Sequence, residues 1–192
     1  MGVVVITPPA AIVTTAEAKQ HLRVDHDDDD ALIDGLVAAA TQVLDGPSGW
    51  LGRALGIQAL ELRLDCFPYC DPIVLPYPPY IDDSIDITYD DSDGAEQSLA
   101  DSYIRVSGGG PYVSRVSLEY GQSWPSVRRQ KDAVRIQYRA GYVSVPAPIK
   151  AAILLHVGTL YENRESVSIA QNAPVVLPQA YEALLAPYRV YL

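Results

Sequence analysis

The sequence predicts an α+β protein: a helical bundle, built from N-terminal and C-terminal helices, with an inserted antiparallel β-rich lobe. Three observations support this. Apolar residues recur at helical spacing over 14–51, alternate with polar residues within 57–142, and form a mostly apolar helix after 146. We therefore expect one composite domain, with N-terminal helices over 14–52, the β-rich lobe over 57–142, and C-terminal helices with a tail over 146–192.

The N-terminal part carries signals for two helices. Thr14 followed by Glu17 is typical of a capping box and predicts a short helix through Leu22. After the acidic run 27–30, apolar residues recur at helical spacing and predict a second helix that ends at the GPSG sequence of 46–49. Carboxylates in a first helical turn are stabilised by the helix dipole, so the acidic run has a structural explanation.

The middle of the chain changes to a two-residue period. Leu60, Leu62 and Leu64 alternate with polar residues, as in a half-buried strand. Further strands are predicted at 73–75, 81–89, 103–106, 113–118 and 133–139. The DDSDG sequence at 90–94 predicts a hairpin turn, and GGG at 108–110 predicts another turn. Short strands at this spacing indicate a small antiparallel sheet or barrel.

The last part returns to helix. Pro146 and Pro148 suit the start of a helix over 149–164, whose aliphatic residues predict a position at the buried centre of the bundle. Residues 166–178 are expected to be extended or loop-like. A short helix over 179–186 is predicted before the aromatic end PYRVYL.

Composition excludes several classes of protein. The chain has 192 residues, 48% of them hydrophobic and 20% charged, which argues against a disordered protein. We expect no targeting signal and no membrane span, because the aliphatic run 151–155 is far shorter than the ~20 residues that a span needs. The net charge of −10 argues against wrapping of a nucleic acid backbone by the whole surface. Cys66 and Cys70 match neither redox nor zinc spacing and are expected to be free thiols.

The sequence contains no completed catalytic signature. It lacks GxSxG, HExxH and a phosphate-binding loop that ends in GK[ST], so we expect no enzyme, no catalytic residue and no cofactor. His21 and His26 lie near the acidic run, but five residues apart they fall on different helical faces, and no metal site is expected. His156, among apolar residues, is predicted to be a core histidine.

Two alternative functions remain open at this point. The β-rich lobe of a monomeric binding module could hold a small ligand or glycan through Tyr77, Tyr80 and Trp124. A metal-dependent hydrolase could instead use the acidic residues at 25–30. An exposed aromatic groove would favour the first, and tight binding of a divalent cation would favour the second.

One basic segment, SWPSVRRQKDAVRIQYR at 123–139, stands out in this acidic chain. Its loop contains Arg128, Arg129 and Lys131, whereas Arg135 and Arg139 share one face of a predicted strand. Arginine is enriched at protein interfaces, so a contact with another subunit or with nucleic acid is as plausible as a solvated surface.

Four blocks of sequence resemble the head-tail connector proteins of tailed bacteriophages, also called adaptor or head-completion proteins, which have relatives in prophages and gene transfer agents. The blocks are AEAKQHLRVDHDDDDALIDGLVAAA at 16–40, WPSVRRQKDAVRIQYRAGY at 124–142, VPAPIKAAILLHVGTLYENRE at 145–165 and ALLAPYRVY at 183–191. They occur in the same order as in the family. Smaller members of the family are essentially helical bundles, so the β-rich lobe is a departure from them.

The resemblance implies a structural protein of the virion neck, made in the host cytoplasm. Family members form a ring, usually of twelve copies, beneath the portal; the ring carries a tail-side neck or stopper protein, and DNA passes through its lumen without sequence-specific binding. The family's C-terminal segment engages the portal, which implies portal contacts for Leu184, Leu185, Pro187, Tyr188, Arg189 and Tyr191.

A ring subunit needs two complementary and non-identical surfaces. We expect the basic loop of one copy to face the acidic helix start of the next copy. The predicted subunit or DNA-channel contacts are therefore Arg128, Arg129, Lys131, Asp27, Asp28, Asp29 and Asp30.

Overall fold

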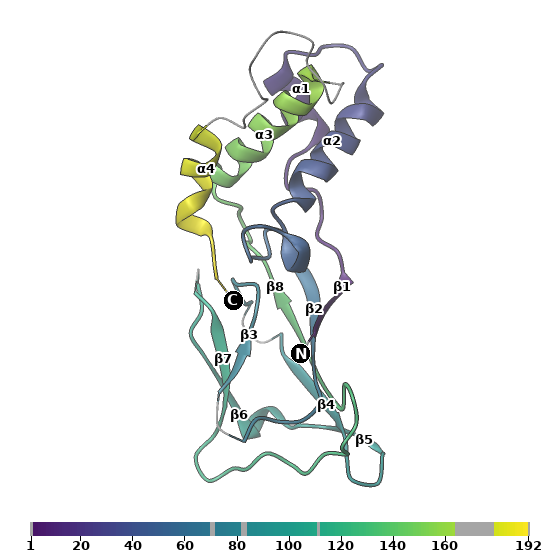
Figure 1. The fold of residues 1–192 in the computed structure, drawn as a ribbon, viewed down its shortest axis with the longest axis vertical. Coiled ribbons are helices and arrows are strands. Elements are labelled where there is room, and N and C mark those ends of the chain that lie inside the picture. The colour runs from purple at the N-terminus through teal and green to yellow at the C-terminus, as the bar shows by residue number, and fades with distance from the viewer. Residues whose placement is uncertain (1, 70–71, 82–83, 111, 164–178, 192) are drawn as a thin grey trace.

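The computed structural model describes residues 2–69, 72–81, 84–110, 112–163 and 179–191. The molecule is elongated, with its α-helices gathered at one end and its strands at the other (Figure 1). The helices are α1 (Thr15–Leu22), α2 (Asp30–Gln42), α3 (Ala147–Glu162) and α4 (Gln179–Leu185). The strands are β1 (Gly2–Thr7), β2 (Gln58–Leu64), β3 (Ile73–Leu75), β4 (Asp86–Asp90), β5 (Glu96–Ser98), β6 (Ile104–Ser107), β7 (Ser114–Leu118) and β8 (Val134–Ala140). The α+β class predicted from the sequence is confirmed.

The helical end forms around the predicted helices. Thr14 caps α1: its hydroxyl accepts a hydrogen bond from the Glu17 amide at 3.2 Å, and the Glu17 carboxylate accepts one from the Thr14 amide at 2.9 Å. This confirms the capping box. In α3, Ile149, Ala152, Ile153 and Val157 are buried, whereas Leu154, Leu155 and Leu160 are only partly buried, so α3 is central but not enclosed on all sides.

The strands form two antiparallel sheets. One has the order β1-β2-β8-β4-β5 and the other the order β3-β7-β6. The predicted strands at 73–75, 103–106, 113–118 and 133–139 match β3, β6, β7 and β8 to within one residue. The strand predicted from residue 81 is wrong at its start, because β4 begins only at Asp86. No element was predicted for β1 or β5.

The predicted turns have the expected chemistry. In the β4–β5 hairpin, one oxygen of the Asp91 carboxylate accepts hydrogen bonds from the amides of Asp93 (3.0 Å) and Ala95 (2.9 Å). Gly94 closes this turn at φ +88°, a conformation that favours glycine. The GGG sequence lies between β6 and β7, where the chain reverses.

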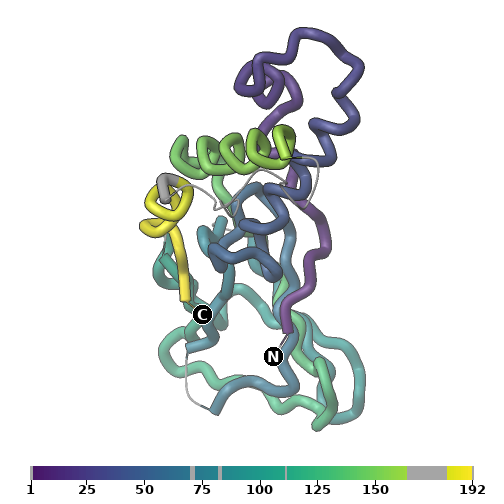
Figure 2. Tube along the Cα trace, turned by 45° about the horizontal axis from the view of Figure 1, so that its top comes forward, coloured from purple at the N-terminus to yellow at the C-terminus, as the bar shows by residue number. Residues whose placement is uncertain are grey.

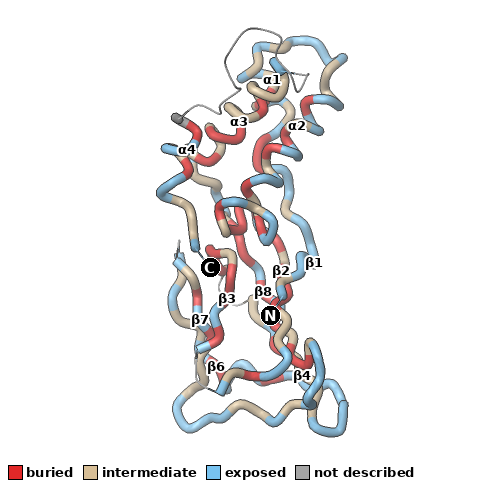
Figure 3. The backbone as a smooth tube through the Cα atoms, in the orientation of Figure 1, coloured by how far each residue is buried: buried red, intermediate tan, exposed pale blue. Residues whose placement is uncertain are grey.

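Buried residues form two hydrophobic clusters, one at each end (Figure 3). The helical cluster includes Ile33, Leu44, Leu51 and Ile153. The β cluster lies between the two sheets and is built from inward-facing residues such as Leu60, Leu62, Val116, Ile136 and Tyr138. The Tyr138 hydroxyl donates a hydrogen bond to the Pro76 carbonyl at 2.7 Å, which satisfies this buried polar group, and burial raises its pKa.

The N-terminal and C-terminal segments run along opposite flanks of the molecule. β1 and the segment that leads from it to α1 run along one flank, while α4 and the C-terminal tail run along the other (Figures 1 and 2). The chain thus starts in the β end, crosses to the helical end and returns through β2. None of the described helices is long and apolar enough to cross a membrane. Cys66 is an exposed free thiol; Cys70 and the loop expected over 166–178 fall outside the described residues.

Candidate interface surfaces

The C-terminal segment places its predicted portal-contact residues in different environments. Leu185 at the end of α4 is fully buried in the helical cluster, and Leu184 and Tyr188 pack against that cluster. Pro187 is exposed, and Tyr191 is 81% exposed. In this conformation the Leu185 side chain belongs to the core, so it has no surface left for a partner.

The tail after α4 is hydrogen-bonded to the loop that contains residues 49–53. The Val190 amide donates a hydrogen bond to the Leu51 carbonyl at 2.9 Å, and the Arg53 side chain donates one to the Tyr188 carbonyl. The Arg189 guanidinium lies 4.3 Å from the ring centroid of Trp50 and 4.7 Å from that of Tyr191. Trp50, which no sequence signal indicates, therefore forms an aromatic and cationic cluster with Arg189 and Tyr191, in which the two rings are exposed and Arg189 is partly buried.

The acidic residues 27–30, at the start of α2, are mostly engaged within their own chain. The Lys19 ammonium binds one carboxylate oxygen of Asp27 at 2.6 Å and one of Asp30 at 2.7 Å, and its hydrogen bond lowers the pKa of Asp27. The Tyr161 hydroxyl donates a hydrogen bond to Asp29. The Asp28 side chain is 96% exposed. In the part of the chain that the structure describes, no group of three or more His, Cys, Asp or Glu residues could hold a metal ion.

The basic loop before β8 remains a loop, with Arg128, Arg129 and Lys131 exposed. The Arg128 amide donates a hydrogen bond to the Asp90 carbonyl at 3.0 Å, and its guanidinium lies beside Gly94 in the turn of the β4–β5 hairpin. On β8, the Arg135 guanidinium binds Asp90 at 2.8 Å and Glu96 at 2.6 Å. The hydrogen bond that the Arg135 guanidinium donates to Asp90 lowers the pKa of Asp90. Arg135 is thus engaged, whereas Arg139 on the same face is exposed.

The predicted pairing of the basic loop with the acidic helix start is possible in only one orientation of the molecule within a ring. The loop between α1 and α2 lies at one tip of the molecule, and the loop before β8 lies at the other tip (Figure 1). Copies related by rotation keep each point at a fixed height along the ring axis. These two surfaces can therefore meet only if the long axis of the molecule lies across the ring axis.

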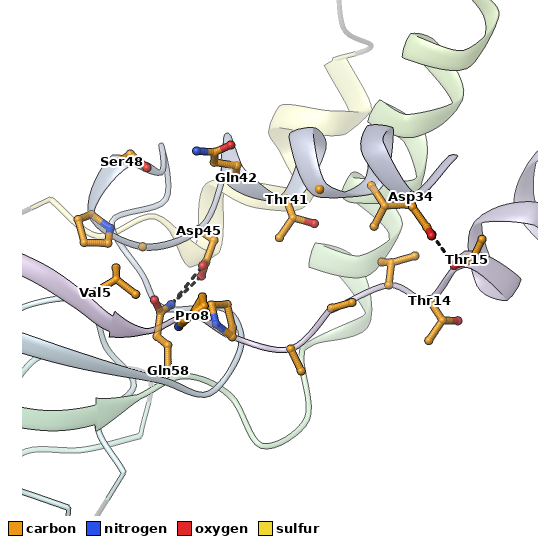
Figure 4. Close-up of a pocket in the computed structure, with 18 residues that line it drawn as sticks. Val5, Pro8, Thr14, Thr15, Asp34, Thr41, Gln42, Asp45, Ser48 and Gln58 are labelled. Carbon is orange, nitrogen blue, oxygen red and sulfur yellow. Dashed lines mark hydrogen bonds between the residues drawn. The ribbon is translucent and has the colours of Figure 1, made fainter. Parts of the chain in front are cut away.

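A hollow of about 670 Å³ lies where the two ends of the molecule join (Figure 4). The segment after β1 forms one wall, and α2 with the short turn after it forms the other. Apolar side chains dominate the walls, among them Val5, Pro8, Ala11, Val13, Val37 and Ala38. Asp34 and Asp45 supply two carboxylates, and no Lys, Arg or His is among the described residues that line the hollow.

Asp45 ties the end of α2 to the start of β2. One oxygen of its carboxylate accepts hydrogen bonds from the Leu55 amide at 2.6 Å and from the Gln58 side chain at 3.1 Å. Burial raises the pKa of Asp45, although these hydrogen bonds oppose the effect. The role of Asp45 depends on contacts made across a loop, and no local sequence signal indicates it.

Asp45→Ala is expected to lower the free energy of unfolding by about 2–4 kcal/mol, because the Leu55 amide and the Gln58 side chain lose their acceptor. Asp45→Asn keeps an oxygen for Leu55 and removes the buried charge, so it is expected to change stability by less than about 1 kcal/mol. Denaturant unfolding of the three proteins at neutral pH measures both effects. Equal losses in the two variants would contradict this role for the hydrogen bonds.

The same variants test a pH dependence. A raised pKa means that folded Asp45 holds its proton more tightly than the unfolded chain does. Ionisation of Asp45 therefore costs stability as the pH rises above the ordinary value of 3.8. Relative to Asp45→Asn, the wild-type protein is expected to lose stability from that pH upward; a constant difference between the two unfolding curves would contradict the sign.

The aromatic residues proposed for ligand binding are packing residues. Tyr80 is buried, Tyr77 packs against the β cluster, and Trp124 stacks on Phe67 with ring centroids 4.7 Å apart. His156 packs edge-on against Tyr181 at 5.7 Å in the helical end, and burial lowers its pKa. The His156 side chain is only partly buried, so it lies at the edge of the helical core and not inside it as predicted.

Comparisons with known proteins give matches among solved structures. No protein-family model matches the sequence, and no curated protein matches it. A chain in a virion structure of a native gene transfer agent particle is 22% identical, with a TM-score of 0.79. A chain in the neck of an empty particle, computed with C6 symmetry, is 21% identical, with a TM-score of 0.80.

A third chain, in the neck of a native particle computed with C12 symmetry, is 18% identical, with a TM-score of 0.68. Each match covers 100% of this chain and 97% of the other chain. The match includes both the helical end and the β end. Over its whole length, the protein therefore has the fold of chains found in the virion and neck of gene transfer agent particles.

Proposed function

We propose that this protein is a structural head-tail connector in the neck of a gene transfer agent or phage particle. The observation that carries the proposal is the fold match over the full chain, with TM-scores of 0.79 and 0.80 for two of the solved chains. The β-rich lobe, which sets this chain apart from the smaller connectors, is part of the matched fold. The lobe therefore counts in favour of the assignment.

In this proposal, twelve copies form a ring beneath the portal. The matched neck structures were computed with C6 and C12 symmetry, which supports a chain that occurs in several equivalent copies around an axis. A closed ring of identical copies needs a heterologous contact between neighbours. The ring joins the capsid to the tail and carries a tail-side neck or stopper protein.

The portal contact is proposed for the exposed part of the C-terminal tail. Pro187 and Tyr191 are exposed, and Arg189 lies between two aromatic rings at the surface. Aromatic residues and arginine are the residue types enriched at protein interfaces. Leu185 is buried in the helical cluster and is not part of the proposed contact.

The charge of the protein suits a channel for DNA. Each copy carries −10, so twelve copies carry about −120 formal charges. A lumen rich in carboxylates repels phosphates and lets DNA slide without sequence-specific contacts. This structural role needs no cofactor, metal ion or catalytic group, and its place is the neck of the virion after synthesis in the host cytoplasm.

Light scattering of the protein alone and with the portal protein of the same particle tests the proposal. We expect a portal-dependent increase in mass that corresponds to one ring of copies on each portal. The portal protein alone and an unrelated acidic protein of similar size are the controls. A mass that stays that of the free protein when the portal is added would contradict the proposed function.

A further inference from the structure

Strand β1 leaves one edge of the five-stranded sheet open. Along the part of the chain that the structure describes, β1 pairs only with β2. Its side chains Val4, Val5 and Ile6 are 40%, 38% and 48% exposed, and the strand has no charged residue and no proline. Its one irregularity is a shift in register between Val5 and Thr7. Edge strands are usually shielded by charges, prolines or a covering element, so β1 is an open site for another molecule.

The hollow described above is continuous with this edge. Val5 belongs to both β1 and the hollow, whose walls are apolar and whose charged groups are the carboxylates of Asp34 and Asp45. We call the exposed side chains Val4 and Ile6, together with the hollow, the β1 flank. Its chemistry is apolar and acidic, and it fits a surface that is apolar and basic.

The opposite flank has this complementary chemistry. In the three-stranded sheet, Val74 on β3 is paired with Arg115 on β7, and Arg105 on β6 is paired with Ser117. Arg115 and Ser117 are two residues apart on β7 and therefore lie on the same face of the sheet. Their partners Val74 and Arg105 lie on that face too, and Val74, Arg105 and Arg115 are all exposed. Neither arginine forms an ion pair with another described residue. We call this face the β7 flank.

The two flanks are placed as a ring requires. β1 and β7 lie on opposite sides of the molecule and overlap in height along its long axis (Figures 1 and 2). Rotation about an axis parallel to the long axis therefore brings the β1 flank of one copy next to the β7 flank of another. The acidic helix start and the basic loop, at opposite tips, do not meet in this arrangement.

We propose that the β1 flank of each copy docks on the β7 flank of a second copy, and that this heterologous contact is the lateral interface of the ring. The proposal rests on the proposed function, because the ring supplies the second copy. Apolar side chains Val4 and Ile6 are covered by the neighbouring sheet. Asp34 and Asp45 of the hollow lie nearer the helical end than Arg105 and Arg115 do, so the acidic and basic flanks attract each other at a distance without forming direct ion pairs. A β1-to-β1 contact would instead be twofold and would stop at a dimer.

Two variants test the two flanks separately. Ile6→Lys places a charge on the β1 flank, and Arg115→Glu reverses the charge on the β7 flank. Both residues are exposed, so circular dichroism and thermal melting are expected to match those of the wild-type protein. Leu32→Lys is the matched control, because Leu32 is 40% exposed on α2 and does not line the hollow. In light scattering with the portal, Ile6→Lys and Arg115→Glu are each expected to reduce ring formation about tenfold or more, and Leu32→Lys is expected to leave it unchanged.

A mixture of the two variants without portal identifies the contact as heterologous. At concentrations where the wild-type protein self-associates, Ile6→Lys and Arg115→Glu are each expected to stay monomeric. In the mixture, Ile6→Lys still has an intact β7 flank and Arg115→Glu still has an intact β1 flank. These two flanks are expected to dock and form dimers that cannot grow further. Monomers in the mixture, or dimers of Arg115→Glu alone, would overturn the proposal.

The outcomes separate this inference from the proposed function. Rings on the portal that form equally well with Ile6→Lys and Arg115→Glu would overturn the inference and leave the connector role intact. The wild-type protein could instead self-associate without responding to the portal, and both variants could lose this self-association. That result would overturn the connector role and support the contact between the two flanks. A wild-type protein that stays monomeric with and without the portal would overturn both.

Discussion

Gly141→Ala is expected to lower the free energy of unfolding by about 2–4 kcal/mol. Gly141 has φ +130°, a conformation that residues with a side chain rarely adopt. A Cβ atom at this position would lie 2.1 Å from the carbonyl oxygen of Gly56. Because that oxygen belongs to the backbone, it cannot rotate away, and the chain itself must shift. Denaturant unfolding measures the loss.

The position of Gly141 explains why the shift matters for the whole molecule. Gly141 follows β8, where the chain leaves the β end for α3. Its amide donates a hydrogen bond to the Pro79 carbonyl at 2.8 Å, and the next amide, of Tyr142, donates one to the Leu55 carbonyl at 3.2 Å. Two passes of the chain between the helical and β ends touch here. A displaced backbone at Gly141 therefore also changes how the two ends are joined.

Gly35→Ala is the matched control. Gly35 lies within α2, is exposed, and has no atom within 4 Å of the place that a Cβ would occupy. Alanine in a helix is more favourable than glycine by about 0.5–1 kcal/mol, so this variant is expected to be more stable than the wild-type protein. A Gly141→Ala variant as stable as Gly35→Ala would contradict the close backbone contact at the junction.

The parts of the fold that could be predicted from the sequence have strong local signals. The capping box of Thr14 and Glu17 and the alternation in β8 both depend on residues that are neighbours in the chain. β1 gave no such signal: its apolar residues are consecutive, and its place in the sheet depends on β2, which lies far away in the sequence. The late start of β4 has a similar cause. The Ile81 amide pairs with the Arg139 carbonyl, but a continuous ladder begins only at Asp86.

The candidate surfaces were harder to predict than the fold. The resemblance to connectors points to the C-terminal segment as a whole, and it does not separate a buried residue such as Leu185 from an exposed one such as Tyr191. The hollow combines Val5, Asp34 and Asp45 from three separate segments. Only the tertiary packing of the helical end on the β end brings these residues together, so no spacing in the sequence indicates them.

Leu185→Ala is expected to lower the free energy of unfolding by about 2–5 kcal/mol, the usual cost of removing a buried leucine side chain. Leu185 is fully buried in the helical cluster, so the substitution leaves a cavity beneath α4. Tyr191→Ala is expected to cost less than about 1 kcal/mol, because Tyr191 is 81% exposed and its main contact is with the Arg189 guanidinium. Thermal and denaturant unfolding of the two variants measure this difference.

Portal binding is expected to show the reverse order. The comparison is made under conditions where both variants are folded. Tyr191→Ala removes a proposed contact and is expected to weaken binding of the protein to the portal. Leu185→Ala removes a core residue and is expected to bind the portal nearly as well as the wild-type protein. The opposite result, a stable Leu185→Ala variant with poor portal binding, would contradict the core role of Leu185. It would mean that Leu185 leaves the helical cluster and contacts the portal when the ring forms.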